Sequence, residues 1–233
     1  MLNTGNTLFL ITARGGSKGI PDKNIKLLGN KPLLYYSIDI ARELTTDEYI
    51  CLSSDSIDII NSARKYGLEV PFVRPSELAT DRIGTYDVLL HAVNYYEKCG
   101  QNLDTVVLLQ PTSPFRKAWQ LKEAMQSYST NIDMVVSVCK SESNPYFNLY
   151  EEDPLGQFIE LSKKAHFVRR QDTPNVYVLN GAIYVINIAS LRKGPLSQFQ
   201  RVVKYEMNSI TSVDLDTMLD WHWAEFLLEK KLV

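Results

Sequence analysis

The sequence predicts an α/β protein with a mostly parallel sheet, and three observations lead to that prediction. Short apolar runs alternate with stretches of helical periodicity, which is the rhythm of repeated βαβ units. The run Thr105–Leu109 (TVVLL) is uninterrupted, as expected of a strand buried on both faces. Polar loops rich in glycine, serine and proline follow several runs, at the edge where open parallel sheets bind their ligands.

The first half of the chain contains the clearest alternation. Thr7–Thr12 (TLFLIT) is short, apolar and rich in β-branched residues, so it predicts a strand. A helix is predicted from Pro32 to about Leu44, because proline suits a first helical turn. The same alternation continues along the chain. It predicts a strand at Tyr49–Ser53, a helix at Ile57–Tyr66, a brief strand at Val70–Val73 and a helix at Thr85–Glu97.

After the buried run at 105–109, the pattern continues and then breaks. A helix is predicted at Trp119–Tyr128 and an apolar strand at Met134–Cys139. From about 140 to 177 the chain has scattered prolines, charges and aromatic residues, and we interpret this segment as an inserted lobe within a single domain, 1–233. Beyond it, the pattern predicts strands at Ala182–Asn187 and Val202–Met207 and a closing helix at Leu215–Lys231.

Composition narrows the class of protein. With 233 residues and 45% hydrophobic content, the chain fits one α/β domain with a sizeable core. A net charge of −2 without a long basic block argues against nucleic acid as the main partner. The three cysteines lack metal-ligand spacing and predict reduced thiols in a cytoplasmic protein. No apolar run approaches ~18 residues, so no membrane span is expected.

The loop Ala13–Asn24 (ARGGSKGIPDKN) is the strongest candidate for binding a polyanion. Glycines let backbone N–H groups approach a ligand, and Arg and Lys side chains add positive charge. Neither GxxxxGK[ST] nor GxGxxG is present, so the alternative is a flexible turn with solvated lysines. The residues that would hold a triphosphate are Arg14, Gly15, Gly16, Ser17, Lys18 and Lys23.

Asp214 and Asp216 stand two positions apart near the end of the chain. In an extended segment both carboxylates point the same way and can share a divalent cation. Mg²⁺ prefers such oxygen ligands and bridges them to phosphates. The alternative is that Asp216 caps the helix that starts near Thr217.

Three further polar residues follow predicted strands. Gln110 ends the buried strand, and its neutral amide can bind a hydroxyl and a carboxylate, although it could instead hold a neighbouring loop. Arg74 on its own reads more readily as a surface cation. Asp55 is equally consistent with a helix cap and with a ligand.

Six blocks, in order along nearly the whole chain, resemble the CMP-sialic acid synthetase (acylneuraminate cytidylyltransferase) family. The blocks are ARGGSKGIPxKN at 13–24, SSD at 53–55, RPxELAxD at 74–81, LLQPTSPxR at 108–116, NGAIY at 180–184 and DxD at 214–216. The resemblance implies a Rossmann-like three-layer nucleotidyltransferase fold whose inserted lobe mediates dimerisation. It also implies a cytoplasmic homodimer that joins CTP to an α-keto acid sugar with Mg²⁺, or Mn²⁺ in its place.

The same resemblance implies roles for individual residues. Catalytic roles fall on Arg14, Lys18, Gln110 and Asp216. The residues expected to contact the nucleotide are those of the loop 14–18, Lys23, Asn24, Arg74 and Thr85. Thr85 belongs to the loop Ile83–Thr85. Sugar contacts fall on Gln110, Arg170, Asn180 and Tyr184, and metal binding falls on Asp214 and Asp216.

The sequence does not identify the sugar that would accept CMP. The family pattern carries a lysine two places after the position of Pro145, whereas this chain has Phe147 there. Sialic, legionaminic and pseudaminic acid are therefore all candidates. The alternatives are a nucleotidyltransferase for another sugar or sugar phosphate, and a non-catalytic nucleotide-binding module.

Overall fold

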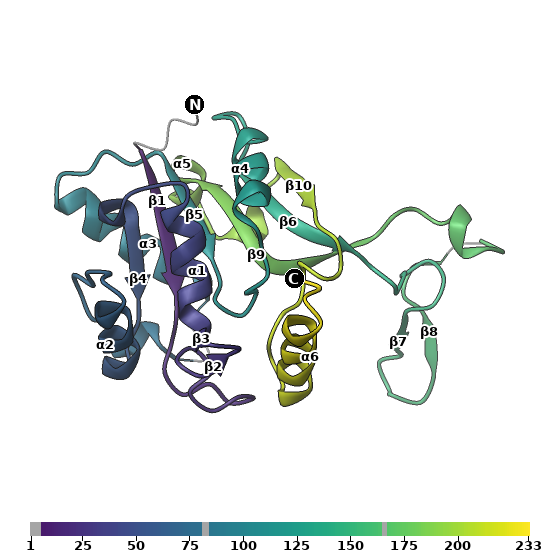
Figure 1. The fold of residues 1–233 in the computed structure, drawn as a ribbon. Helices are drawn as coiled ribbons and strands as arrows, with labels where there is room; N and C mark the ends of the chain where they lie inside the picture. The colour runs from purple at the N-terminus through teal and green to yellow at the C-terminus, as the bar shows by residue number, and fades with distance from the viewer. Residues whose placement is uncertain (1–5, 81–83, 165–166) are drawn as a thin grey trace.

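A computed structural model describes residues 6–80, 84–164 and 167–233, and its centre is one six-stranded sheet in the order β10-β6-β9-β5-β1-β4 (Figure 1). The strands of this sheet are β1 (Thr7–Thr12), β4 (Ile50–Ser53), β5 (Thr105–Leu109), β6 (Met134–Lys140), β9 (Tyr177–Asn187) and β10 (Val202–Glu206). Two small pairs lie outside it: β2 (Leu27–Leu28) with β3 (Lys31–Pro32), and β7 (Tyr150–Glu152) with β8 (Ile159–Leu161).

Helices cover both faces of the sheet and complete three layers. They are α1 (Leu33–Arg42), α2 (Ile57–Lys65), α3 (Thr85–Lys98), α4 (Ala118–Gln126), α5 (Ile188–Leu191) and α6 (Met218–Glu229). The 3₁₀ turns are η1 (Asp47–Tyr49), η2 (Ser76–Leu78), η3 (Arg170–Asp172) and η4 (Leu196–Gln198). Buried residues of α1, α2 and α4 share one apolar cluster with the sheet, and those of α3 and α5 share another. This layering confirms the predicted α/β class.

The sheet is mostly parallel, as predicted, with one exception. β1 runs parallel to β4 and β5, and β10 runs parallel to β6. β9 is antiparallel to both β5 and β6, because the chain leaves the body along β6 and returns beside it along β9. The return places the beginning of β9 at the carboxyl end of β5, since Leu108 pairs with Tyr184.

Three loops start at one edge of the sheet. Thr12 pairs with Ser53 and Ile11 with Leu109, so β1, β4 and β5 end at nearly the same level. The loops that follow these ends are the glycine-rich loop, the SSD segment and the loop that begins at Gln110. The prediction that they would gather at one edge is confirmed.

Three predicted elements differ clearly in the structure. β9 begins at Tyr177, five residues before the predicted start at Ala182. The strand at Val70–Val73 is wrong, because the chain there is irregular: Pro71 lacks an N–H donor and Val73 is 51% exposed. The closing helix begins at Met218 rather than Leu215, because Thr217 caps it. Leu215 is buried in a separate apolar cluster that joins α6 to α1 through Leu33 and Trp221.

Residues 141–176 form a lobe that projects from the body (Figure 1). It contains the β7–β8 hairpin and η3, and it leaves large apolar side chains such as Phe158 and Ile159 exposed. Val178 and Leu179 on β9, where the lobe rejoins the body, are also more than half exposed.

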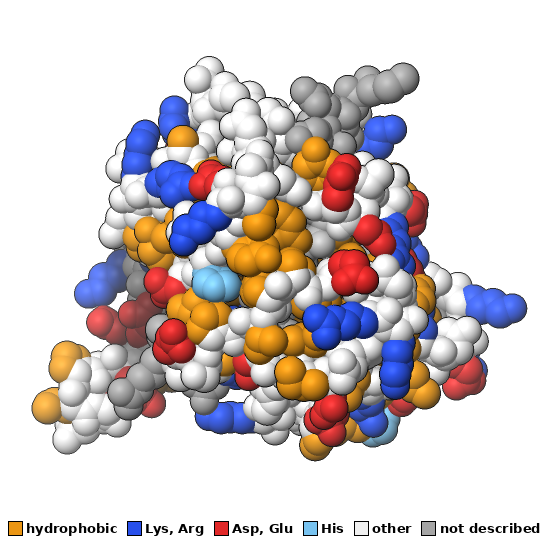
Figure 2. All heavy atoms as spheres, turned by 90° about the vertical axis from the view of Figure 1, so that its left-hand side faces the viewer, with side chains coloured by type: hydrophobic (Ala, Val, Ile, Leu, Met, Phe, Trp, Pro, Cys, Tyr) orange, Lys and Arg blue, Asp and Glu red, His pale blue; other side chains and the backbone are white. Residues whose placement is uncertain are grey.

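The described surface shows a mixed charge. On the face in Figure 2, lysine and arginine side chains are interspersed with aspartate, glutamate and apolar ones, without one continuous basic patch in that view. This distribution matches the small net charge of −2. Among the described residues, no helix has the length and apolar character needed to cross a membrane.

Candidate active site

A cleft of about 620 Å³ lies at the edge where β1, β4 and β5 end. Polar side chains from both ends of the chain line it, together with apolar ones at Leu78, Ala79, Val88 and Pro111. Predicted site residues among the lining are Arg14, Ser17, Lys18, Lys23, Asn24, Arg74, Thr85, Gln110, Asp214 and Asp216. One space therefore collects residues from most of the six sequence blocks.

Short-range contacts shape the loop after β1. The Asn24 side-chain amide donates to the carbonyl of Arg14 at 3.0 Å, which closes the loop across its base. The Gly15 N–H donates to Asp55 Oδ1 at 2.9 Å, which ties the loop to the end of β4. Gly16 has φ +63°, a conformation that glycine adopts without strain. These two bonds tie the start and the end of the loop to the edge of the sheet, while Gly16 and Lys18 between them are exposed.

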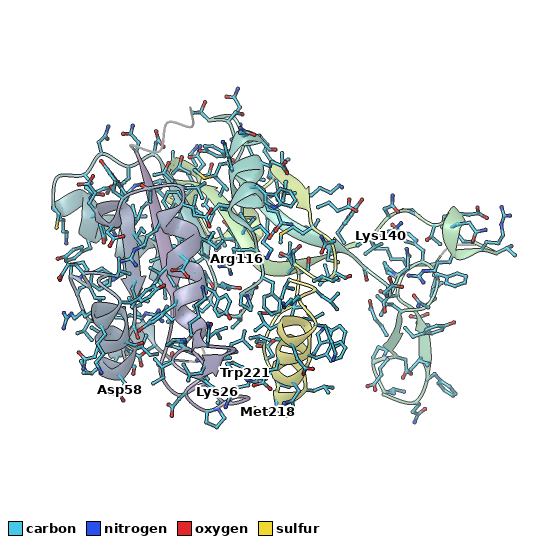
Figure 3. The ribbon with its side chains drawn as sticks, viewed as in Figure 1. Lys26, Asp58, Arg116, Lys140, Met218 and Trp221 are labelled. Carbon is cyan, nitrogen blue, oxygen red and sulfur yellow. The ribbon has the colours of Figure 1, made fainter. Side chains whose placement is uncertain are left out.

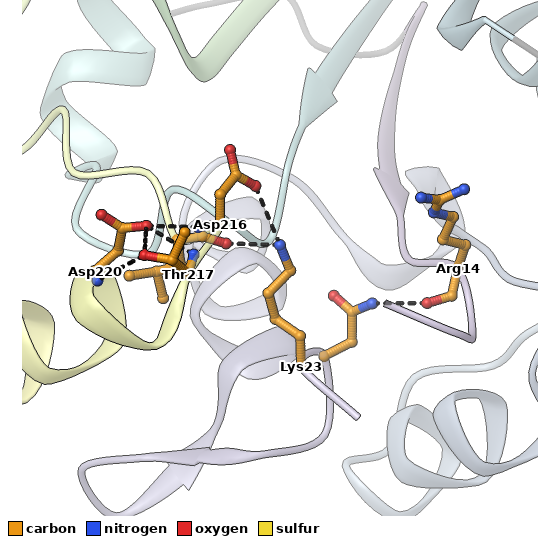
Figure 4. A network of polar contacts seen from close by, with 7 residues as sticks. Arg14, Lys23, Asp216, Thr217 and Asp220 are labelled. Atoms are coloured by element: carbon orange, nitrogen blue, oxygen red, sulfur yellow. Dashed lines mark hydrogen bonds and ion pairs between the residues drawn. The ribbon is translucent and has the colours of Figure 1, made fainter. Parts of the chain in front are cut away.

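The same loop packs against the acidic segment near the C-terminus (Figure 4). A Cβ on Gly19 would lie 2.0 Å from the carbonyl oxygen of Asp216, so only glycine fits there. Lys23 Nζ donates to the Leu215 carbonyl at 2.6 Å and lies 3.4 Å from Asp216 Oδ1. Residues almost 200 positions apart therefore form one wall of the cleft.

The acidic pair faces the cleft, and its charges interact. Burial and then the nearby charge of Asp216 raise the pKa of Asp214, while a hydrogen bond from Thr112 and the charge of Lys23 oppose that rise. The alternative that Asp216 caps α6 is wrong. Thr217 is the cap, and it shares a capping box with Asp220.

Gln110 follows the end of β5, and Tyr184 on β9 pairs with Leu108, two residues before it. Gly181 has φ +71°, and a Cβ there would lie 2.6 Å from Gln110 Oε1, so the amide rests against bare backbone. Burial, followed by the charge of Asp214, raises the pKa of Tyr184. Asn180 is only 5% exposed and donates to Ser212 Oγ at 2.8 Å, so it supports this corner from behind the cleft.

Arg74 forms part of the opposite wall and is 5% exposed, so the alternative of a surface cation is wrong. Its Nε donates to Ser53 Oγ at 2.9 Å, and its Nη2 donates to the Ser53 carbonyl. Burial lowers its pKa. Thr85 begins α3 beside it, whereas Ile83 and Asp81 of the sequence blocks lie outside the described residues.

Five predicted site residues do not line the cleft: Gly15, Gly16, Asn180, Tyr184 and Arg170. Arg170 is the one of them that belongs to the lobe. It lies in η3 of the lobe, where Nη2 contacts both the carbonyl and the carboxylate of Glu142 at 2.8 Å. It lines a separate hollow of about 440 Å³ at the base of the lobe.

The comparison with known families identifies the class of protein. The family described as cytidylyltransferase matches residues 8–223. The chain belongs to the cytidylyltransferase family.

This cytidylyltransferase is similar to two curated relatives and to one solved structure. It is 32% identical over 225 residues to the CMP-N,N'-diacetyllegionaminic acid synthase of Legionella pneumophila, covering 95% of this chain and 96% of that protein. It is 35% identical over 226 residues to an N-acylneuraminate cytidylyltransferase of Streptococcus agalactiae, covering 92% of this chain but about half (51%) of that protein. The solved CMP:2-keto-3-deoxy-manno-octonic acid synthetase with CTP shares the fold, with TM-score 0.72 and 14% identity over 97% of this chain and 99% of that one.

Sequence reasoning missed two supporting residues of the cytidylyltransferase and left a third undecided. Asp55 anchors the glycine-rich loop, although the sequence alone made a helix cap equally plausible. Thr112 hydrogen-bonds Asp214, and Arg116 donates to the Gln110 carbonyl from the interior. The only indication in the sequence was their position. Asp55 follows the end of β4, and Thr112 and Arg116 follow the end of β5, in loops that begin at the edge where the cleft lies.

Proposed function

We propose that this cytidylyltransferase transfers CMP from CTP to a nonulosonic acid and releases pyrophosphate. The observation that carries the proposal is the contact of Gly19 and Lys23 with the segment of Leu215 and Asp216. That contact sets a cationic loop and an acidic pair around one cleft, as a nucleoside triphosphate with a divalent cation requires. The names of the relatives, which are synthases of CMP-legionaminic and CMP-sialic acids, supply the acceptor class.

The nucleotide is proposed to lie with its phosphates along the glycine-rich loop. Arg14 and Lys18 line this side, and a guanidinium and an ammonium suit phosphate oxygens as a fork and as a point charge. Arg74 and Thr85 line the part of the cleft next to α3, where the cytidine would sit. Lys23 is already engaged with Leu215 and Asp216, so we assign it to the loop contact before phosphate binding.

The donor set at the acidic pair fits Mg²⁺, with Mn²⁺ as a substitute. Asp214 and Asp216 both line the cleft, and carboxylate oxygens with phosphate and water ligands satisfy such a hard cation. Burial, and to a smaller extent the charge of Asp216, raises the pKa of Asp214, and a divalent cation would offset both effects. When bound, the cation would neutralise negative charge on the reacting phosphates. Among the described residues, no group of three or more His, Cys, Asp or Glu side chains suggests a different metal site.

In the proposed reaction the acceptor hydroxyl oxygen bonds to the α-phosphorus of CTP. The bond from that phosphorus to the oxygen bridging to the β-phosphate breaks, pyrophosphate leaves with the electron pair, and the hydroxyl proton passes to solvent. Gln110 lines the cleft and is placed to orient the hydroxyl and carboxylate of the acceptor. Arg14 and Lys18 would stabilise the charge on the leaving pyrophosphate.

The proposed assembly is a homodimer in the cytoplasm. Exposed apolar side chains on the lobe, including Phe158 and Ile159, favour burial against a partner. In a dimer, Arg170 of one chain could reach the cleft of the other chain, because it does not line the cleft of its own chain. Free Cys51, Cys99 and Cys139 suit a reducing compartment.

The experiment that tests the function is a pyrophosphate-release panel. Purified protein would be combined with CTP, UTP, GTP or ATP and with sialic, legionaminic or pseudaminic acid or a sugar 1-phosphate, in the presence of Mg²⁺. The proposal expects release only with CTP and a nonulosonic acid, and loss of release when EDTA removes the cation. Release with a sugar phosphate, or CTP binding without turnover, contradicts it.

A further inference from the structure

Arg116 is a charged side chain enclosed within the main body. It is 1% exposed and ranks among the largest fully buried side chains, and Figure 3 shows it in the interior beside α1. Burial lowers its pKa to about 9, so the guanidinium keeps its proton at neutral pH. A permanent positive charge is therefore held inside the body behind the cleft.

The contacts of this guanidinium connect three parts of the structure. Nη1 donates to Ser37 Oγ on α1 at 2.8 Å, and Nη2 donates to the Gln110 carbonyl at the end of β5. Its Nε has no hydrogen-bond partner among the described residues. The acidic group whose charge acts on it is Asp214.

Packing alone does not explain an arginine at this position. A buried charge without a close counter-ion destabilises a fold, and an apolar side chain of similar volume often replaces it without loss. Its neighbour Phe115 fills the apolar cluster with Trp221, so the core beside it is already closed. We therefore look for the effect of the Arg116 charge at the cleft, which lies on the other side of Gln110.

The loop that Arg116 ends also supports the acidic segment. The Leu215 N–H donates to the Thr112 carbonyl at 2.9 Å, and Thr112 hydrogen-bonds Asp214. A shift of the 110–116 loop would thus move Gln110 and the acidic pair together. By holding the Gln110 carbonyl and placing positive charge behind Asp214, one guanidinium acts on both.

We propose that Arg116 is a positioning residue of the transfer reaction, which fixes the main chain at Gln110 and sets the relative placement of the Gln110 amide and the acidic pair. This inference rests on the proposed function. Arg116 touches neither substrate, since it is enclosed by protein. Its effect should therefore appear in the use of the acceptor and of Mg²⁺, which depend on Gln110 and on the acidic pair, whereas the direct CTP contacts on the glycine-rich loop and at Arg74 lie on other elements.

The test compares Arg116→Met, which has similar length but no charge, with Arg116→Lys, which keeps the charge, and with Ser37→Ala as the matched control. For Arg116→Met we expect kcat/KM for the acceptor to fall about ten- to a hundredfold, with the Kd for CTP, measured by calorimetry without Mg²⁺, changed less than about threefold. Arg116→Lys should lie between Arg116→Met and wild type. Ser37→Ala should keep wild-type kinetics, because it leaves the Gln110 contact in place.

Several outcomes would overturn the proposal. Wild-type acceptor kinetics in Arg116→Met would do so, as would equal losses for CTP and acceptor that follow a lowered Tm, or a lysine variant no better than methionine. If the methionine variant does not fold, wild-type kinetics in Arg116→Lys overturn it instead. A wild-type chain that turns over no nonulosonic acid contradicts the proposed function itself, which separates that failure from failure of the role of Arg116.

Discussion

At the scale of single residues, the glycines of the first loop have separate tasks. Gly16 supplies a positive φ, while Gly19 supplies space against the Asp216 carbonyl. Gly15 donates its N–H to Asp55. The sequence indicates a loop that permits close approach, but only the folded chain shows that Gly19 approaches backbone from the far end of the sequence.

Gly19→Ala tests the contact between the two walls of the cleft. The added Cβ would meet the Asp216 carbonyl oxygen at 2.0 Å, so the loop or the acidic segment must move. We expect kcat/KM to fall at least about tenfold, since a small misplacement of charged groups weakens transition-state binding.

The matched control for this substitution is Gly100→Ala. Gly100, unlike Gly19, has a positive φ, and it lies against open space, so alanine there should cost about 1 kcal/mol of stability and leave the kinetics unchanged. Steady-state kinetics and thermal unfolding of both variants check the pair. Unchanged kinetics in Gly19→Ala would contradict a working contact at this position.

Asp216→Asn tests the acidic pair at nearly constant shape. Removing one carboxylate should lower turnover by about a hundredfold or more, while the protein stays folded, because Thr217 and Asp220 still cap α6. Metal affinity, measured by calorimetry with Mg²⁺ and CTP, should fall in parallel.

Asp220→Asn is the control for charge in the same segment. Asp220 accepts the N–H groups of Asp216 and Thr217, so its loss should lower stability by about 1 kcal/mol but change turnover only a few-fold. Turnover near the wild-type level in Asp216→Asn would remove the assigned role of the pair.

At the scale of elements, an acidic anchor joins the start of β6 to the start of β10. Asp133 accepts from the Arg201 N–H at 2.8 Å, the Arg201 guanidinium at 2.7 Å and Ser190 Oγ at 2.8 Å. These bonds, with that of Arg201 the largest, hold the pKa of Asp133 well below its usual range. The charged carboxylate thus favours the folded state.

Asp133→Asn should therefore show a pH-dependent loss of stability. Because the pKa is depressed on folding, the contribution of the carboxylate is present above its unfolded pKa, about 3.9, and declines as pH falls towards the folded value. The difference in free energy of unfolding between wild type and variant should be largest near pH 7 and shrink below about pH 4. Urea unfolding across pH 3–7 measures it, and a difference that grows on acidification would contradict the anchor.

Much of the element order was predictable because buried strands and amphipathic helices leave strong local patterns. β1, β5 and β6 are apolar throughout most of their length, and their predicted bounds agree closely with the structure. The direction of β9 was not predictable, because an apolar run reads the same in parallel and antiparallel sheets. Val70–Val73 was mispredicted because Val70 is buried without entering the sheet, while Val73 is exposed.

Residues that line the candidate site could be predicted from the sequence, but the buried residues that hold them in place could not. Arg14, Gln110 and Asp214 were recognisable from residue type and from their places at strand ends and loops. Asn180 is buried behind the cleft, and the role of Arg116 depends on a contact with a main-chain carbonyl, which leaves no trace in residue type. Contacts of that kind require the fold.

At the scale of the whole molecule, the lobe separates Arg170 from the cleft of its own chain. If a partner's lobe completes each cleft, Arg170→Ala and Asp216→Asn should each be nearly inactive alone. Mixing the two variants under exchange conditions should restore part of the activity, because hybrid dimers contain one cleft with neither substitution. Light scattering would report the dimer, and a monomer at micromolar concentration or a mixture without recovery would contradict it.

The central claim is that the glycine-rich loop and the acidic pair bind the two sides of one triphosphate. A crystal structure with CTP and Mg²⁺ tests it most directly. In that structure we expect the phosphates to lie beside Arg14 and Lys18, with the cation between those phosphates and the carboxylates of Asp214 and Asp216. A nucleotide bound away from this cleft, or a cation held by other residues, would contradict it.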